Sequence, residues 1–286
     1  MKASRCGVLL MTKLIAFDLD NTLLNTKKEV SPENMRVLKL AASLGIEIVP
    51  VTGRAWGGVP DNVKSMEFVR YAVTLNGAEI VDVKNNKTIS EALLPPERGI
   101  TLCRIIDELP VIYDCIADGV RFMNRRCYDN VESVSTGAWQ TKIIRDSAKP
   151  VDDVAEVLAK CKGIQKMQIY TRDEELRNNL LKAFPVVFPK ALFTSSVGNN
   201  IEINDPSANK GGGLRFIAEY LNIPVSATMA FGDGLNDITM IQAAGIGVAM
   251  GNACREILEV ADHVTTDCDH DGVAEGIKTF CRGIDD

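Results

Sequence analysis

Short apolar runs alternate with helix-type spacing in the first part of the chain. Residues 14–19 (LIAFDL) form an apolar run typical of a strand that is buried on both faces of a sheet. Residues 31–33 (SPE) suit the start of a helix, and apolar positions then recur at helical spacing until Gly45. Residues 46–51 predict a second strand, and Asn76-Gly77 predicts a tight turn between two further strands.

The last third of the chain repeats this alternation. Leu214, Ile217, Ala218 and Leu221 form a helical stripe. Further apolar segments predict strands at 227–231 and 246–249, and helices at 238–244, 254–261 and about 273–280. Strands that are separated by helices favour a doubly wound α/β fold, in which a parallel sheet carries helices on both faces.

The middle of the chain has a different pattern. It opens with the polar turn at 84–87 and contains Pro95-Pro96. Helix-like segments at 98–109 and 152–160 are interleaved with strand-like segments at 111–117 and 167–170. We therefore expect a Rossmann-like core of residues 1–82 and 201–286, with an inserted α+β domain of residues 83–200.

Charge and composition exclude several classes of protein. The 286 residues include 32 Lys and Arg against 38 Asp and Glu, a net charge of −6. Without a basic run, the chain is a poor candidate for binding nucleic acid or an anionic membrane surface. No apolar stretch approaches the roughly 18–20 residues that span a bilayer. A phosphate-binding pocket stays compatible with this charge, because net charge does not constrain one site.

The start of the chain and the cysteines bear on the cellular compartment of the protein. The apolar run at 8–11 is broken by Lys13 and makes no full signal-peptide core, so residues 1–10 are expected to be an extended start or a frayed tail. None of the eight cysteines forms a CxxC pair, which argues against zinc ribbons and thioredoxin-type sites. Scattered cysteines fit reduced thiols, and we expect a cytoplasmic protein.

A pair of acids directly follows the first predicted strand. Alternation along an extended chain points Asp18 and Asp20 the same way. Two carboxylates this close repel each other, so one of them should have a raised pKa unless a cation is present. Mg²⁺ would resolve the conflict, because it prefers a few carboxylates together with water and phosphate oxygens.

Three further polar clusters stand where predicted strands end or helices begin. Thr52-Gly53-Arg54 offers a hydroxyl, a flexible backbone and a cation for an anionic oxygen. Lys210 precedes three glycines at a helix start, a suitable place for an anion. The loop at 232–237 adds Asp233 and Asp237 as metal ligands. Because open parallel sheets bind ligands at the carboxyl ends of their strands, these clusters together suggest phosphoryl transfer through an aspartyl intermediate.

The four clusters resemble the motifs of the haloacid dehalogenase superfamily. The matching segments are DLDNTLL at 18–24, VTGR at 51–54, Lys210-Gly211 and FGDGLND at 231–237. Their order and spacing look like those of its Cof-type (type IIB) phosphatases, in which a cap domain is inserted between the second and third motifs. Thr52 and Lys210 are 158 residues apart here. Asn21 departs from the usual glycine of Cof-type members, but asparagine tolerates unusual backbone angles.

The resemblance implies a role for each matching residue. Asp18 attacks phosphorus and carries the aspartyl phosphate, while Asp20 protonates the leaving alcohol and then activates water. Thr52 hydrogen-bonds the phosphoryl oxygens, and Lys210 neutralises their charge. The acid at Asp20 also favours ester hydrolysis over dehalogenation, because the dehalogenating branch lacks it.

The metal and the remaining phosphate contacts are also implied by the resemblance. Mg²⁺ is expected to bind Asp18, the backbone carbonyl of Asp20, and Asp233, with Asp237 supporting the site. Gly53 and Asn236 are further expected phosphate-binding residues. The expected function is therefore Mg²⁺-dependent hydrolysis of small phosphorylated metabolites, with sugar phosphates as first choice and pyridoxal phosphate or flavin mononucleotide next.

Other functions and motifs are compatible with parts of this sequence. A sugar phosphomutase would use the same core, and a non-catalytic phospho-ligand sensor would retain the fold. No GxxxxGK[ST] pattern exists, which excludes a P-loop, and Lys278 replaces the twelfth-position glutamate of an EF-hand that would begin at Asp267. In the cap, Arg121, Arg125 and Arg126 could bind a second anion, but a solvated basic face explains them at least as well. Substrate could also contact Ser195, Ser196 or Asn199, which lie near the return to the core.

Overall fold

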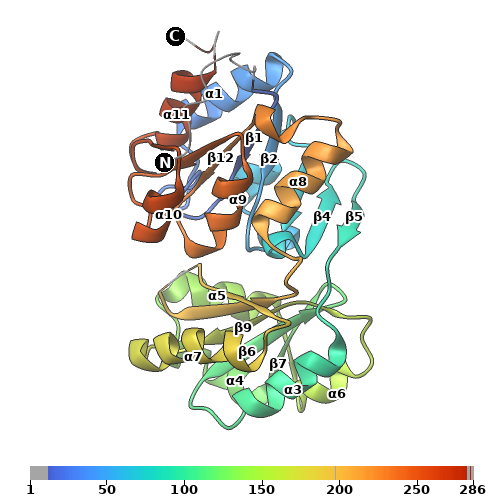
Figure 1. Cartoon of the computed structure of the whole chain (residues 1–286). Helices are drawn as coiled ribbons and strands as arrows, with labels where there is room; N and C mark the ends of the chain where they lie inside the picture. The colour runs from blue at the N-terminus through green and yellow to red at the C-terminus, as the bar shows by residue number, and fades with distance from the viewer. Residues whose placement is uncertain (1–11, 197, 282–283, 285–286) are drawn as a thin grey trace.

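The computed structural model describes residues 12–196, 198–281 and 284. Residues 1–10, for which an extended start or a frayed tail was expected, lie outside the described residues. Figure 1 shows two units, one built from both ends of the chain and one from its middle. None of the described helices is long and apolar enough to cross a membrane.

A parallel sheet of five strands forms the centre of the first unit, in the order β14-β13-β12-β1-β2. All neighbouring strands in it run parallel. β1 lies between β12 and β2 and is completely buried, which explains its uninterrupted apolar sequence. The strands are β1 (Leu14–Phe17), β2 (Glu47–Pro50), β12 (Thr228–Gly232), β13 (Ile246–Ala249) and β14 (His263–Val264).

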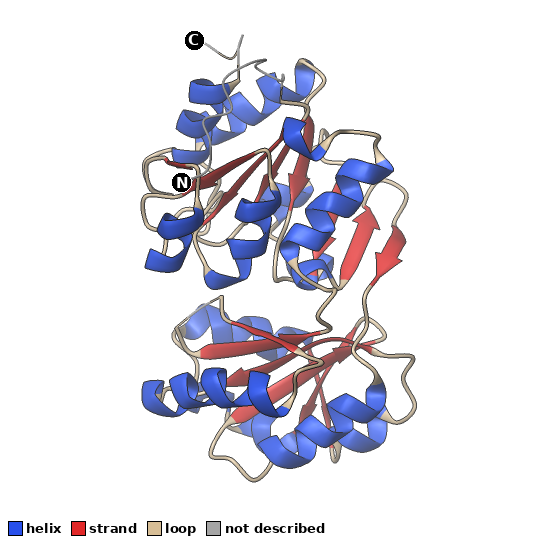
Figure 2. Ribbon diagram, in the orientation of Figure 1, coloured by secondary structure: helices blue, strands red, loops and turns tan. Residues whose placement is uncertain are grey.

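Helices cover both faces of this sheet, as Figure 2 shows. Ile15 and Phe17 pack into one apolar cluster with residues of α1 (Pro32–Ser43) and α11 (Gly272–Phe280). Leu14 and Ala16 point to the opposite face, because side chains alternate along a strand. There they pack with α8 (Lys210–Tyr220), α9 (Ile238–Ala243) and α10 (Arg255–Val260). The expected doubly wound parallel sheet is confirmed.

An antiparallel ribbon extends the sheet beyond β2. It consists of β3 (Tyr71–Thr74), β4 (Glu79–Asp82) and β5 (Lys87–Glu91), and β3 meets the sheet through the bridge between Val51 and Val73. The Asn76-Gly77 turn between β3 and β4 has φ angles of 61° and 99°. A Cβ on Gly77 would lie 2.6 Å from the carbonyl oxygen of Asn209, so this close approach requires glycine. Short helices complete the unit: η1 (Trp56–Gly58), α2 (Asp61–Lys64), η2 (Leu75–Gly77), η4 (Val225–Ala227) and η5 (Leu235–Asp237).

The second unit, the cap, is built on a six-stranded sheet in the order β10-β11-β9-β6-β7-β8. Its strands are β6 (Ile112–Ala117), β7 (Val120–Asn124), β8 (Ala148–Val151), β9 (Ile164–Tyr170), β10 (Leu192–Thr194) and β11 (Asn200–Asn204). Its helices are α3 (Pro96–Ile106), α4 (Arg125–Asp129), η3 (Val131–Ser133), α5 (Ala138–Ser147), α6 (Val154–Leu158) and α7 (Glu174–Val187).

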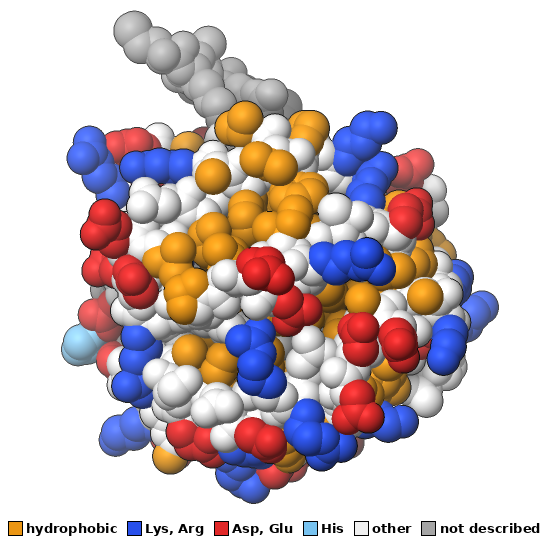
Figure 3. All heavy atoms as spheres, turned by 90° about the horizontal axis from the view of Figure 1, so that it is seen from below, with side chains coloured by type: hydrophobic (Ala, Val, Ile, Leu, Met, Phe, Trp, Pro, Cys, Tyr) orange, Lys and Arg blue, Asp and Glu red, His pale blue; other side chains and the backbone are white. Residues whose placement is uncertain are grey.

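The two faces of the cap sheet differ in character. On β9, Met167 and Ile169 join the apolar cluster that the cap helices cover. The alternate residues Lys166, Gln168 and Tyr170 line a cavity that the first unit also lines. Seen from outside the cap, Figure 3 shows positive and negative side chains interspersed around apolar ones. The alternation along β9 thus directs polar side chains toward the first unit and apolar ones toward the cap helices.

The chain crosses between the two units twice. It leaves the ribbon after β5, which ends at Glu91, and it returns after β11, which ends at Asn204. β5 thus belongs with the strands of the first unit, and β11 with the cap sheet. The boundaries expected from the sequence, after residue 82 and before residue 201, stay a prediction.

Candidate active site

The four polar clusters lie at one edge of the parallel sheet. β1 pairs with β12 on one side and β2 on the other, so the segments that follow these three strands start beside one another. Asp18, Thr52 and Asp233 stand in those segments, and Lys210 begins α8. The sheet topology therefore assembles residues that are up to 215 positions apart in sequence, such as Asp18 and Asp233, as expected for strand ends in a parallel sheet.

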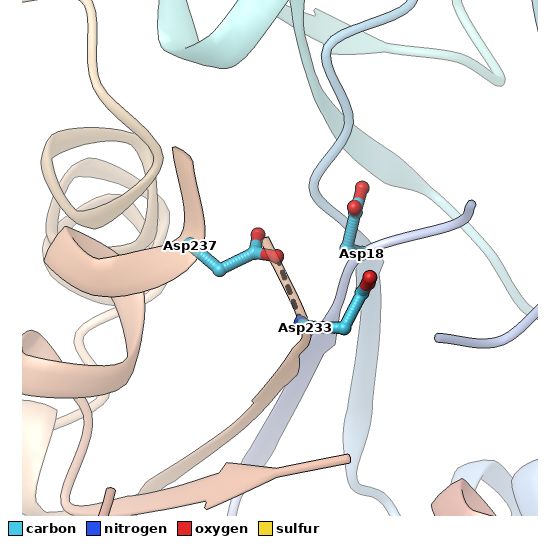
Figure 4. A group of neighbouring side chains, drawn as sticks. All are labelled: Asp18, Asp233 and Asp237. Carbon is cyan, nitrogen blue, oxygen red and sulfur yellow. Dashed lines mark hydrogen bonds between the residues drawn. The ribbon is translucent and has the colours of Figure 1, made fainter. Parts of the chain in front are cut away.

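Three carboxylates converge at the centre of this edge. Asp18, Asp233 and Asp237 each offer an oxygen, and these oxygens lie within 4.8 Å of one another. Figure 4 shows the three side chains around one small space. The backbone N–H groups of Asp233 and Gly234 both donate to Asp237 Oδ2 at 3.0 Å, which orients that side chain. Thr22 Oγ1 donates to Asp233 Oδ1 at 2.8 Å.

The charge balance of this cluster favours a bound cation. Burial raises the pKa of Asp18 well above its usual range, and the charges of Asp237 and Asp233 raise it further against the opposing Lys210. Burial and the charge of Asp237 also raise the pKa of Asp233 to about 7. The three carboxylates carry more negative charge than the single Lys210 ammonium can balance. Clustered carboxylate oxygens of this kind suit a hard divalent cation such as Mg²⁺. The residues present therefore fit the metal site expected from the sequence.

Lys210 is the cation that the cluster already contains. Its side chain is fully buried, and Nζ lies 2.8 Å from Asp18 Oδ1 and 2.6 Å from Asp237 Oδ1. Burial opposes its charge, but Asp18 and Asp237 together raise the pKa of Lys210 above its ordinary value. The ammonium is thus held in its charged form beside the Asp18 carboxylate, where it can meet an anionic ligand.

Asp20 lies apart from the three-carboxylate cluster and has its own cations. Arg54 donates two hydrogen bonds to its carboxylate, from Nε to Oδ2 at 2.7 Å and from Nη2 to Oδ1 at 2.8 Å. Lys28 Nζ adds a third contact at 3.0 Å. Although burial acts in the opposite direction, these two cations lower the pKa of Asp20 to about 2. Asp20 is therefore an anion in this arrangement, and Arg54 and Lys28 reduce its affinity for a proton.

The residues expected to bind phosphate also reach this edge. Thr52 is buried after β2, and its Oγ1 accepts a hydrogen bond from the Arg54 N–H at 3.1 Å. A Cβ on Gly53 would lie 3.0 Å from Asn76 Oδ1, so any larger residue at position 53 would crowd the Asn76 side chain. Asn236 Nδ2 donates to the same Asn76 oxygen at 3.2 Å, while Asn236 Oδ1 is buried without a hydrogen-bond partner among the described residues.

A cavity of about 310 Å³ lies between these residues and the cap. Asp18, Asp20, Thr52, Gly53 and Asn236 line it from the first unit. The side chains and backbone on the opposite side are called the cap wall here, and they are Ile116, Gly119, Arg121, Gln140, Ile143, Ile144, Ser147, Lys166, Gln168, Tyr170, Ser196, Asn200 and Glu202. The size and the mixed polar and apolar lining suit a small molecule.

A buried ion pair that the sequence analysis missed joins the two units. Lys166 Nζ lies 2.5 Å from Glu202 Oε1, and the two side chains are 3% and 2% exposed. Lys166 also donates to the Gly53 carbonyl at 2.6 Å, and Asn76 Nδ2 donates to Glu202 Oε2 at 2.8 Å. The signal in the sequence was a charged residue inside each of the apolar strands IQKMQIY and NIEIN.

Only some of the cap residues that were expected to contact substrate line the cavity. Arg121 and Ser196 line the cavity. Arg125 and Arg126 are 61% and 57% exposed and face Asp152 and Asp107, respectively, outside the residues that line the cavity. Asn199 is buried inside the cap, where its Nδ2 donates to the carbonyl of Val134 at 2.8 Å. Ser195 is buried outside the residues that line the cavity, and its Oγ accepts a hydrogen bond from Arg177 Nη2 at 2.6 Å.

We expect Glu202→Gln to lower the free energy of unfolding by about 3–5 kcal/mol at neutral pH, because Lys166 would stay buried without its carboxylate. Burial raises the pKa of Glu202, but Lys166 and Asn76 lower it below its ordinary value. The stability that Glu202 contributes is therefore present above its unfolded-state pKa of about 4.3 and is lost as pH falls through the lower folded value. Urea unfolding should show a difference that shrinks in acid.

Glu259→Gln is the matched control for this measurement. Glu259 pairs with Arg255 at 2.8 Å, but both side chains are exposed, at 59% and 88%. An exposed pair of this kind contributes about 0–1 kcal/mol. Equal unfolding midpoints for the two variants at pH 7 would show that the buried pair does not stabilise the junction.

Comparisons with known proteins agree with this geometry. The family model for haloacid dehalogenase-like hydrolases matches residues 15–277. Phosphatase YwpJ of Bacillus subtilis is 30% identical over 283 residues, which cover 93% of this chain and 99% of that protein. The 5-amino-6-(5-phospho-D-ribitylamino)uracil phosphatase YcsE of Bacillus subtilis is 30% identical over 267 residues, which cover 93% and 94% of the two chains.

Solved structures show the same arrangement. A phosphatase of the haloalkanoate superfamily from Bacteroides thetaiotaomicron superposes with a TM-score of 0.78, at 28% identity, over 100% of this chain and 98% of that one. A sugar phosphatase of superfamily subclass IIB has a TM-score of 0.80 over 96% and 100% of the two chains, and at 23% identity it shows likeness of fold. The expected superfamily and its inserted cap are confirmed. The chain belongs to the haloacid dehalogenase-like hydrolase family, and it is an enzyme of the phosphatase class.

Proposed function

We propose that this phosphatase hydrolyses small phosphorylated metabolites with Mg²⁺, and that sugar phosphates are its preferred class. The observation that carries the proposal is the Asp18 carboxylate beside Lys210 in a cavity whose opposite side is a hydrogen-bonding cap wall. Pyridoxal phosphate and flavin mononucleotide come next as substrates. The names of relatives, a ribitylaminouracil phosphatase and a sugar phosphatase, support a substrate of this size.

In the first step, an Asp18 oxygen attacks phosphorus and the bond between phosphorus and the ester oxygen breaks. The negative charge on the phosphoryl oxygens is met by Lys210, which already lies 2.8 Å from Asp18. Thr52, Gly53 and Asn236 line the same end of the cavity and would orient the phosphoryl group through a hydroxyl, a backbone amide and a side-chain amide. The product of this step is an aspartyl phosphate and an alcohol.

Asp20 would handle the protons of both steps. It gives a proton to the leaving alkoxide, then takes one from the water that attacks the aspartyl phosphate, which releases phosphate and restores Asp18. In the structure, Arg54 and Lys28 hold Asp20 as an anion, so it must part from these cations to carry a proton in the first step. The second step starts from the anion, and release from these cations would raise its affinity for the proton of water there as well.

Asp18, Asp233 and Asp237 are the side chains that would hold Mg²⁺, with the Asp20 carbonyl as a further ligand. Bound there, Mg²⁺ would keep the carboxylates ionised and offset charge on the phosphoryl oxygens. Asp237 has a second task, because it holds Lys210 at 2.6 Å and receives two backbone N–H groups. It therefore ties the position of the lysine to that of the metal ligands.

Removal of divalent cations is expected to reduce hydrolysis of p-nitrophenyl phosphate by roughly 10²-fold or more, since three clustered carboxylates would repel an incoming phosphate. The measurement is the initial rate after dialysis against EDTA, followed by titration with MgCl₂. Potassium chloride at equal ionic strength is the control and should restore nothing. Full activity in the EDTA-treated protein would contradict the metal assignment.

A panel of phosphorylated metabolites tests the substrate class. Purified protein with Mg²⁺ is assayed for phosphate release from sugar phosphates, pyridoxal phosphate and flavin mononucleotide, ranked by kcat/KM. Sugar phosphates should rank first. Isomerisation of a hexose phosphate without phosphate release would instead favour a mutase.

We also propose a cytoplasmic location. The seven described cysteines are all free thiols, which is typical of proteins in a reducing compartment.

A further inference from the structure

Arg121 is the cap-wall cation that could meet a second anionic group of a substrate. It lies on β7 (Val120–Asn124), lines the cavity, and has a side chain that is 16% exposed. An arginine in such a place commonly binds carboxylate or phosphate, because its planar fork matches both. What the cavity accepts therefore depends on whether the charge of Arg121 is already balanced.

Asp114 provides that balance from behind the cap wall. It stands on β6 (Ile112–Ala117) and is completely buried, and Arg121 Nη1 lies 3.4 Å from its Oδ2. Tyr170 Oη donates to Oδ2 at 2.9 Å and Gln168 Nε2 to Oδ1 at 3.3 Å. Both carboxylate oxygens thus have neutral donors from β9 that fix Asp114 in place beside the guanidinium.

The other charges near the cavity are also paired among the described residues. Lys166 is bound to Glu202 and to the Gly53 carbonyl, and Arg54 grips Asp20. On the cap side, Arg121 and Lys166 are matched by Asp114 and Glu202, so these four charges sum to zero. Each cap-side cation that lines the cavity is thus already balanced by a neighbouring carboxylate, so the net attraction for an incoming second anion is small.

The rest of the cap wall offers neutral hydrogen-bonding groups and apolar surface. Gln140, Ser147 and Tyr170 line the cavity, together with Ile143 and Ile144 of the same helix as Gln140. Amides and hydroxyls of this kind both donate and accept, as hydroxyl groups of a ligand require. The lining therefore matches an alcohol that is hydroxylated and uncharged.

We propose that the Arg121–Asp114 pair sets substrate selectivity, so that this phosphatase accepts phosphomonoesters of neutral, hydroxylated alcohols and rejects those that carry a second anionic group. This inference rests on the proposed function, because it concerns the alcohol half of the substrate in the same cavity. Asp114 acts through Arg121 and never touches the substrate, so it is a positioning and charge-balancing residue. Its removal should widen the substrate range.

Two substrates with the same carbon skeleton test the inference. D-Glucitol 6-phosphate and 6-phosphogluconate are both open-chain, and they differ in a neutral hydroxymethyl group against a carboxylate at the far end from the phosphate. The wild-type ratio of their kcat/KM values should favour the neutral sugar alcohol by about tenfold or more. In Asp114→Asn, Arg121 keeps its charge and loses its anion, so this ratio should fall by about tenfold through a gain with 6-phosphogluconate.

Arg121→Gln is the opposite change and should raise the ratio, because the buried charge of Asp114 then acts on the cavity without the cation that balances it. The double variant Asp114→Asn/Arg121→Gln should return the ratio toward the wild-type value. Circular dichroism and thermal unfolding check that each variant is folded. If Asp114→Asn does not fold, the change in Arg121→Gln decides the matter by itself.

Two results would overturn the inference. One is a wild-type preference for 6-phosphogluconate, and the other is a ratio that stays the same in a folded Asp114→Asn or Arg121→Gln variant. Failure of the proposed function is distinguishable, because wild-type protein would then hydrolyse neither compound nor p-nitrophenyl phosphate. Activity on p-nitrophenyl phosphate with an unchanged ratio would leave the phosphatase chemistry intact and reject only the role of the Arg121–Asp114 pair.

Discussion

Asp18→Asn is expected to reduce hydrolysis of p-nitrophenyl phosphate by at least about 10³-fold, because an amide oxygen cannot act as the nucleophile. The same substitution should leave the free energy of unfolding unchanged or increase it. Burial and two neighbouring acids hold the pKa of Asp18 well above its usual range, so removal of this charge relieves repulsion in the metal-free protein. Lys210 keeps its contact with Asp237 at 2.6 Å.

The separation of activity from stability makes this prediction specific. Initial rates and urea unfolding are measured on the same preparation of wild-type and variant protein. Asp61→Asn is the matched control, because it removes one carboxylate that is fully exposed. It should change neither quantity beyond about 0.5 kcal/mol in stability. Full activity in Asp18→Asn would reject the aspartyl-phosphate mechanism, whereas joint loss of activity and fold would point to a structural role for Asp18.

Lys210→Met is expected to lower the free energy of unfolding by about 3–5 kcal/mol in metal-free buffer at neutral pH, and activity by about 10²-fold or more. Asp18 and Asp237 would lose the buried ammonium that lies within 2.8 Å of each. Asp18, whose pKa is raised by burial, becomes neutral as pH falls, so the loss of stability should be smaller in acid. Mg²⁺ should restore part of it, if the three carboxylates bind the ion.

Lys278→Met provides the control for this second experiment. Lys278 also lies between two carboxylates, with Glu33 at 2.7 Å and Glu275 at 3.1 Å, but its side chain is 23% exposed. Solvent screens such a group, so the substitution should cost about 1 kcal/mol or less. Similar unfolding midpoints for the two variants would show that burial does not make the Lys210 contacts stronger than surface ones.

Local signals in the sequence were sufficient for the elements of the core. The strand predicted at 14–19 is β1, which covers Leu14–Phe17, and the strand predicted at 246–249 is β13 with the same bounds. Other elements moved at their ends: the strand predicted at 46–51 covers Glu47–Pro50, and the helix predicted at 254–261 covers Arg255–Val260. Ends shift because terminal residues make few hydrogen bonds within their own element. The periodicity that decides the type of element is not affected.

The partners of the site residues were less predictable. Alternation placed Asp18 and Asp20 on one side of an extended chain, yet Asp18 belongs to the carboxylate cluster while Asp20 is held by Arg54 and Lys28. The sequence showed Arg54 as a candidate for an anionic oxygen, but not which anion it would contact. The choice depends on side-chain directions after the strand ends, where the alternation no longer holds.

The sequence by itself determined the parallel core and the meeting of Asp18, Thr52 and Asp233, because the carboxyl ends of neighbouring parallel strands lie at one edge of a sheet. It could not determine the pairs Lys166–Glu202 and Arg121–Asp114. Each pair joins two neighbouring antiparallel strands of the cap sheet, and their contact depends on strand order and register, which no local pattern specifies. The tertiary structure therefore decided which cap charges are balanced at the cavity.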